Sequence, residues 1–139
     1  NAPNILLGAE VLICDGMDQL DGLDRLCRQG TKELLLELPF YKWSESVWET
    51  VERLNDRDDI LIVIAHADRY SPEDIERLIG EGIPLQLNVE CFKNPLRRKQ
   101  YISWTEKGYV RYLGSDMHML ETGYKDWVKC RKILEKKAK

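Results

Sequence analysis

The chain has 139 residues, of which 43% are hydrophobic and 32% are charged, and its formal net charge is −3. This length predicts a single domain, residues 1–139, and no apolar stretch approaches the roughly 20 residues that cross a bilayer, so we expect a cytoplasmic protein without membrane insertion. Charges of both signs are spread along the chain, which excludes a basic face for nucleic acid and leaves a small ligand or a protein as the partner.

Apolar runs and helical periodicities alternate along the sequence. The first run, from Ile5 to Ile13, predicts a strand, and the spacing of Leu20, Leu23 and Leu26 predicts an amphipathic helix. The predicted strands are 5–13, 34–38, 61–65, 84–89 and 110–113, and the predicted helices are 18–29, 45–54, 71–79, 95–104 and 124–137. Five strands interleaved with helices predict an α/β fold with parallel βαβ packing.

A few positions predict where helices start and which faces they bury. Ser46 and Glu49 have the spacing of a capping box at the start of the second helix. Ser71 followed by Pro72 combines a capping hydroxyl with proline in the first turn. The last helix is expected to bury Trp127, Cys130, Ile133 and Leu134.

The chain has only two histidines, and each follows an apolar run. His66 comes after the run from Leu61 to Ala65, and His118 comes after the run from Val110 to Leu113. The carboxyl ends of parallel strands deliver side chains to one edge of a sheet or barrel, so both imidazoles are expected there. Together with nearby carboxylates they predict a metal site. For His66 taken by itself, a structural histidine is the simpler interpretation.

Carboxylates occupy comparable positions. Asp116 is two residues from His118, so both side chains point the same way in an extended segment. Glu10 is an acid inside an apolar strand, which is costly unless the charge is paired or binds a metal, and Glu37 after another apolar run is a similar case. Without a metal, Asp116 is explained as a cap and Glu10 by a solvent-exposed strand face. Mixed histidine and carboxylate ligands suit Mn, Fe or Zn, with oxygen donors favouring Mn or Fe.

At these residues the sequence resembles the PHP (polymerase and histidinol phosphatase) superfamily. Within it, the chain is most similar to the manganese-dependent protein-tyrosine phosphatases of bacterial capsule and exopolysaccharide biosynthesis. The similar segments are Gly8-Ala9-Glu10-Val11, Leu35-Leu36-Glu37-Leu38-Pro39, Ala65-His66-Ala67-Asp68-Arg69-Tyr70, Gln86-Leu87-Asn88 and Leu113-Gly114-Ser115-Asp116-Met117-His118.

The resemblance implies a partial, distorted (β/α)7 PHP-type barrel that lacks its first strands and holds up to three Mn²⁺ or Fe ions when complete. It implies Glu10, His66, Asp116 and His118 as metal ligands, with Arg69 as a catalytic residue at the substrate phosphate. Arg69 is otherwise explained by a surface ion pair with Asp68 or Glu73. The implied activity is metal-assisted hydrolysis of phosphotyrosine proteins, with a bacterial tyrosine kinase as a candidate partner. Histidinol phosphate is the alternative substrate.

The chain departs from the family pattern in two respects. The family usually reads A-H-P-E-R-Y where this chain has Ala67 and Asp68. The family's opening strand with its H-x-H pair, and the Asp and His ligands after it, have no counterpart here. We therefore expect weak metal binding and poor turnover, because the mechanism needs its ions held together. An uncovered edge at the first predicted strand also predicts self-association.

Two other functions remain open. Cys91 and Arg97 have the C-x5-R spacing of cysteine-dependent tyrosine phosphatases, but the segment lacks the glycines that expose backbone amides to a phosphate. The four cysteines have no C-x-x-C spacing, which favours reduced, mostly buried thiols. Alternatively, the chain is a non-catalytic truncated barrel that binds a partner. Metal content separates these functions, since only the PHP interpretation requires bound Mn or Fe.

Overall fold

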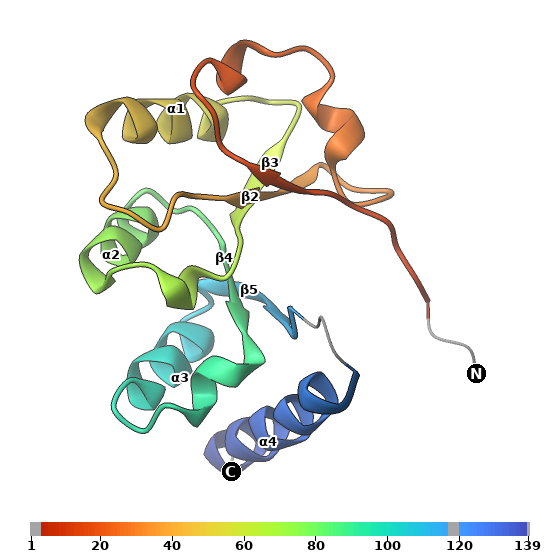
Figure 1. The fold of residues 1–139 in the computed structure, drawn as a ribbon, viewed down its shortest axis with the longest axis vertical. Coiled ribbons are helices and arrows are strands. Elements are labelled where there is room, and N and C mark those ends of the chain that lie inside the picture. Colours follow the sequence, from red (N-terminus) through yellow and green to blue (C-terminus); the bar gives the residue numbers. More distant parts are fainter. Residues whose placement is uncertain (1–3, 117–119, 139) are drawn as a thin grey trace. The chain divides into compact units, whose positions relative to one another are not determined.

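The computed structural model describes residues 4–116 and 120–138, which contain five strands and four α-helices (Figure 1). The first two strands follow one another without an α-helix, and an α-helix precedes each later strand. The strand pairs described within each unit are parallel, which confirms the α/β class. The chain divides into two compact units, the first ending at Ala65 and the second beginning at His66. Within the described ranges, no helix combines the length and the apolar character needed to span a bilayer.

The first unit contains a three-stranded parallel sheet and one α-helix. β1 (Glu10–Leu12) pairs with β2 (Glu33–Glu37), which pairs in turn with β3 (Leu61–Ile64). The helix α1 (Glu45–Asn55) contacts β3. Alternation along β2 directs Leu34 to the fully buried face of the sheet. The fully buried core of this unit contains Leu34, Leu36, Leu38, Val51, Leu54, Ile62 and Ile64.

The helix α1 forms as predicted, but a different residue caps it. Ser44 is the N-cap, and its Oγ accepts a hydrogen bond from the backbone N–H of Val47 at 3.4 Å. The predicted capping box at Ser46 and Glu49 is therefore wrong by two residues. The hydroxyl of Ser46 lies 2.9 Å from that of Ser44.

The helix predicted over residues 18–29 is wrong. Two short 3-10 helices, Met17–Gln19 and Leu23–Leu26, occupy the segment. Gly22 lies between them with φ +82°, a left-handed conformation that interrupts a right-handed helix. In addition, Nη1 of Arg57 donates to the carbonyls of Asp18 and Leu20 at 3.0 and 2.8 Å. These long-range hydrogen bonds stabilise the two 3-10 helices in place of a continuous α-helix.

The predicted strand from Ile5 to Ile13 shortens to β1. Before Glu10 the backbone is hydrogen-bonded to the loop that follows the second 3-10 helix, where the Gln29 N–H donates to the Leu7 carbonyl at 2.6 Å. Ile5 and Leu7 are therefore exposed rather than packed in a sheet. β1 also leaves Leu12 59% exposed, and self-association stays a prediction.

The second unit contains a parallel pair of strands with three α-helices. β4 (Leu85–Asn88) pairs with β5 (Val110–Gly114). α3 (Arg98–Glu106) contacts β5, and the long α4 (Leu120–Ala138) contacts the 3-10 helix Val89–Lys93 (Figure 1).

The remaining helix of this unit, α2 (Pro72–Gly80), begins as predicted. Ser71 Oγ accepts from the backbone N–H of Asp74 at 3.2 Å, and Pro72 occupies the first turn, where no N–H is needed. The burial predicted for α4 is only partly right. Cys130 is buried, but Trp127 is 41% exposed.

Candidate metal centre

Strand register places two carboxylates on one face of the first unit's sheet. Glu10 of β1 is opposite Leu35 of β2, and Leu12 is opposite Glu37. Because side chains alternate along a strand, Leu35 and Glu37 lie on the same face of β2. Glu10 is paired with Leu35, so its side chain lies on that face of the sheet too. Glu37 is the last residue of β2, so its carboxylate stands at the carboxyl end of the strand.

His66 follows β3 and reaches the same end of the sheet. The N–H of Ala65 donates to the Leu36 carbonyl at 2.9 Å, so the residue before His66 still pairs with the residue before Glu37. At His66 the backbone turns into the left-handed region, with φ 34° and ψ 51°. This turn ends the strand and starts the 3-10 helix Ala67–Arg69. His66 is therefore presented at a strand end, as predicted.

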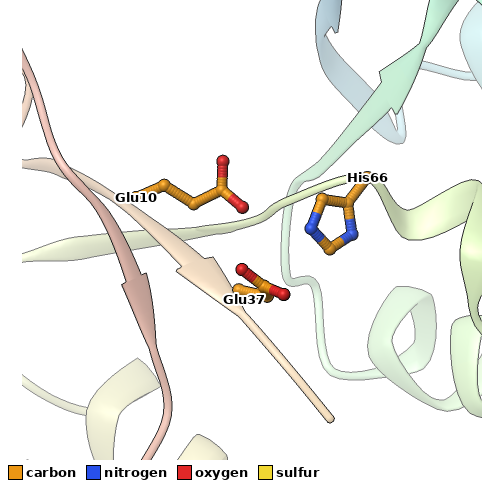
Figure 2. Close-up of side chains that lie close together, drawn as sticks. All are labelled: Glu10, Glu37 and His66. Atoms are coloured by element: carbon orange, nitrogen blue, oxygen red, sulfur yellow. The ribbon is translucent and has the colours of Figure 1, made fainter. Parts of the chain in front are cut away.

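Glu10, Glu37 and His66 each offer one ligand atom, and these three atoms lie within 4.8 Å of one another. Figure 2 shows the two carboxylates and the imidazole ring directed toward a common space. With bonds of about 2.1 Å, donors on one ion lie about 3 Å apart when adjacent and about 4.2 Å apart when opposite, so the three side chains would have to move closer together to bind a single ion. Two carboxylates and one imidazole also match the donor chemistry of Mn, Fe or Zn.

The three candidate ligands differ in burial, and the exposure of Glu10 corrects the sequence argument that its carboxylate is costly to bury. His66 is 3% exposed and Glu37 is half-buried, but Glu10 is exposed. The high cost of burying an acid therefore does not apply to Glu10. What brings Glu10 into the group is the register of β1 against β2. The sequence marks Glu37 as an acid after an apolar run but does not indicate it as a ligand, because only the strand register shows which residues lie beside it.

Asp116 and Arg69 meet in the second unit. Nη2 of Arg69 donates to Oδ2 of Asp116 at 2.7 Å, an ion pair between residues 47 positions apart in sequence. Asp116 follows β5 and has φ 44°, a left-handed conformation that is uncommon for residues other than glycine. This ion pair differs from the predicted alternative, in which Arg69 pairs with Asp68 or Glu73, since its partner is a residue that the resemblance implies as a metal ligand. The predicted ligand His118 lies outside the described residues.

A buried polar network lies at the carboxyl end of β4. The side chains of Gln86 and Asn88 are buried, and Gln86 Nε2 donates to Asn88 Oδ1 at 3.1 Å. The N–H of Asn88 donates to Oδ1 of Asp68 at 2.8 Å. Burial raises the pKa of Asp68, and the bond from Asn88 opposes that shift only in part. Asp68 occupies the position where the PHP pattern has Glu.

The cysteine of the C-x5-R segment is poorly suited to act as a nucleophile. Cys91 is buried, and burial raises its pKa, with the nearby Asp68 carboxylate adding to the shift. Arg97 acts in the opposite direction but does not reverse it. A catalytic cysteine needs a lowered pKa, because the thiolate is the reactive form. Cys14, Cys27, Cys91 and Cys130 are all free thiols, and all but Cys14 are buried, as predicted.

No protein-family model, curated protein or solved structure matches the chain.

Proposed function

We propose that the chain acts in metal-dependent hydrolysis of phosphomonoesters, as a protein-tyrosine phosphatase of the PHP type. The group formed by Glu10, Glu37 and His66 carries this proposal. Glu37 and His66 stand at or just past the carboxyl ends of β2 and β3, which is where α/β folds place catalytic groups. Glu10 adds a second carboxylate from the first residue of the neighbouring strand β1. The barrel form of the domain, its role in capsule or exopolysaccharide biosynthesis and its Mn²⁺ or Fe cofactor are proposed from the sequence resemblance.

Glu10, Glu37 and His66 would hold the divalent ion. Bound ions of this kind lower the pKa of a coordinated water and offset negative charge on phosphate oxygens. The two carboxylates supply negative charge that attracts the ion, and the imidazole adds a neutral donor when it is deprotonated. His66 is buried, whereas Glu10 is exposed, so the group has a protected side and a side open to solvent.

Arg69 would bind the substrate phosphate. Its side chain is 39% exposed, and a planar guanidinium can donate two parallel hydrogen bonds to phosphate oxygens. The ion pair with Asp116 orients one edge of that guanidinium. Asp116 would thus position Arg69, besides its proposed role as a ligand. A phosphotyrosine protein, such as a bacterial tyrosine kinase, is the proposed substrate, because this chemistry recognises the phosphoryl group.

The test is hydrolysis of a phosphotyrosine peptide and of histidinol phosphate by the purified chain, with Mn²⁺ or with EDTA. We expect slow hydrolysis that requires Mn²⁺ and is lost in His66→Ala. Glu76→Gln is the matched control, since Glu76 is an exposed acid in α2, outside the group. Faster hydrolysis of histidinol phosphate would change the substrate class. Equal rates with EDTA and Mn²⁺, or an unaffected His66→Ala variant, would overturn the metal mechanism.

A further inference from the structure

We propose that Gln86 is a positioning residue that holds the backbone of His66 in the conformation needed to present its imidazole. Gln86 is a buried residue of β4, and its Oε1 accepts a hydrogen bond from the His66 N–H at 2.6 Å. This inference rests on the proposed role of His66 as a metal ligand. It adds a residue that contributes to the metal site without touching the metal.

His66 needs such support because its backbone conformation is unfavourable. With φ 34° it lies in the left-handed region, which costs a non-glycine residue roughly 1–2 kcal/mol. Conformations of this kind persist only where the surroundings determine them strongly. Two hydrogen bonds do so here, since the His66 carbonyl accepts from Arg69 N–H at 3.0 Å while its N–H donates to Gln86.

Gln86 is itself held in one orientation. Its Nε2 donates to the Leu87 carbonyl at 2.9 Å and to Asn88 Oδ1 at 3.1 Å. Exchanging the amide oxygen and nitrogen would face Nε2 toward the His66 N–H and Oε1 toward two acceptors, so only one orientation satisfies all three bonds. A buried amide with every bond made is costly to disturb, because each lost partner leaves a desolvated polar group.

The backbone at Gly114 leaves room for the amide of Gln86. Gly114 is the last residue of β5 and is paired with Asn88 of β4. A Cβ at this position would lie 2.6 Å from Nε2 of Gln86, closer than two such atoms can approach. A side chain at position 114 would therefore displace the amide of Gln86 or shift the backbone beside it. Displacing this amide would disturb the bond from the His66 N–H to Oε1.

The test measures Mn²⁺ affinity of the full chain by electron paramagnetic resonance for the unmodified protein, Gln86→Leu and Gly114→Ala. We expect each substitution to weaken Mn²⁺ binding by about 10–100-fold, the usual effect of losing a residue that orients a ligand. The double variant should bind no more weakly than Gln86→Leu alone, because both changes act through the same amide. Gly80→Ala is the matched control, since a Cβ at Gly80 has no heavy atom within 4 Å.

Two further readouts separate positioning from general stability. Gln86→Glu keeps an oxygen that can accept from the His66 N–H, so it should recover part of the affinity lost in Gln86→Leu. Hydrogen exchange of the His66 amide should accelerate in Gln86→Leu and Gly114→Ala but not in Gly80→Ala.

The outcomes distinguish this inference from the proposed function. If His66→Ala binds Mn²⁺ as tightly as the unmodified chain, the metal role of His66 fails and the inference fails with it. If His66→Ala loses Mn²⁺ while folded Gln86→Leu and Gly114→Ala retain full affinity, only the positioning role is overturned. If Gln86→Leu does not fold, the decision passes to Gly114→Ala and Gln86→Glu, each of which keeps a polar residue at position 86.

Discussion

Replacing Glu10 by glutamine should change stability in opposite directions with and without metal. The ligand oxygens of Glu10 and Glu37 lie within 4.8 Å of each other. At 4.8 Å, two unit negative charges repel by about 0.9 kcal/mol in water and by about 3.5 kcal/mol at an effective dielectric constant of 20. Because Glu10 is exposed, the lower value applies. Without metal, Glu10→Gln should therefore stabilise the chain by about 1 kcal/mol, which raises its Tm by about 3 °C.

With metal the sign reverses. At a Mn²⁺ concentration 100 times its dissociation constant, binding stabilises the unmodified chain by about 2.7 kcal/mol. If losing the Glu10 carboxylate weakens binding by about 100-fold, the same Mn²⁺ concentration stabilises the variant by only about 0.4 kcal/mol. The variant should then be about 1.3 kcal/mol less stable than the unmodified chain, despite its advantage without metal.

Thermal unfolding followed by circular dichroism, in EDTA and in Mn²⁺, measures both differences. Glu76→Gln removes another exposed carboxylate, from α2, and should show neither effect. The reasoning is refuted if Glu10→Gln shifts Tm by the same amount in EDTA and in Mn²⁺. That result would mean that Glu10 does not take part in binding the ion.

Three further substitutions test the second unit. Asp68→Asn should stabilise the chain at neutral pH, because burial raises the folded pKa of Asp68 and ionised Asp68 is then a cost. The advantage should shrink as pH falls and vanish only below about 4, where the unfolded carboxyl is protonated as well, as urea unfolding across that range would show. Arg69→Lys should raise KM for a phosphotyrosine peptide by about tenfold, since a point charge replaces a two-pronged donor, and an unchanged kcat/KM would remove Arg69 from the site. Cys91→Ser should leave hydrolysis almost unchanged, because the buried thiol has a raised pKa, and a dead variant would restore the cysteine mechanism.

Local signals in the sequence predict most elements of the fold. α1 and α2 have apolar stripes and capping residues, and β3 is a short apolar run between polar turns, so these segments form where expected. The segment from residue 18 to 29 has a helical stripe too, yet it forms two 3-10 helices. Gly22 lowers the helix propensity of this segment, and that can be read from the sequence. The hydrogen bonds from Arg57 to the loop carbonyls cannot, because they join residues 37 and 39 positions apart. No local pattern contains that information.

The candidate metal centre divides in a similar way. The sequence indicates His66 by its position after an apolar run and Glu10 by its position inside one, together with the family resemblance, and the structure brings their ligand atoms close to that of Glu37. The role of Glu37 depends on which residues lie beside the end of β2. That is set by the pairing register of β2 and β3, which the sequence of neither strand predicts by itself. The sequence also gives no sign of the contact between Gln86 and His66. Gln86 lies between two leucines, and nothing in that pattern indicates that its side chain accepts a hydrogen bond from a residue 20 positions earlier.

Backbone strain gives an argument for the site that is independent of ligand spacing. Among the described residues, His66 and Asp116 are the two non-glycine residues with positive φ, and both were selected as metal ligands from the sequence. Residues with a strained backbone concentrate at functional sites. Glycine adopts a left-handed conformation without strain, so a non-glycine residue at such a position suggests that its side chain is needed. His66→Gly and His66→Ala both remove the imidazole, but only alanine retains the strain. We therefore expect His66→Gly to be more stable by about 1 kcal/mol, or about 3 °C in Tm. Equal melting temperatures for the two variants would show that the left-handed conformation carries no cost, and strain would no longer support a function for His66.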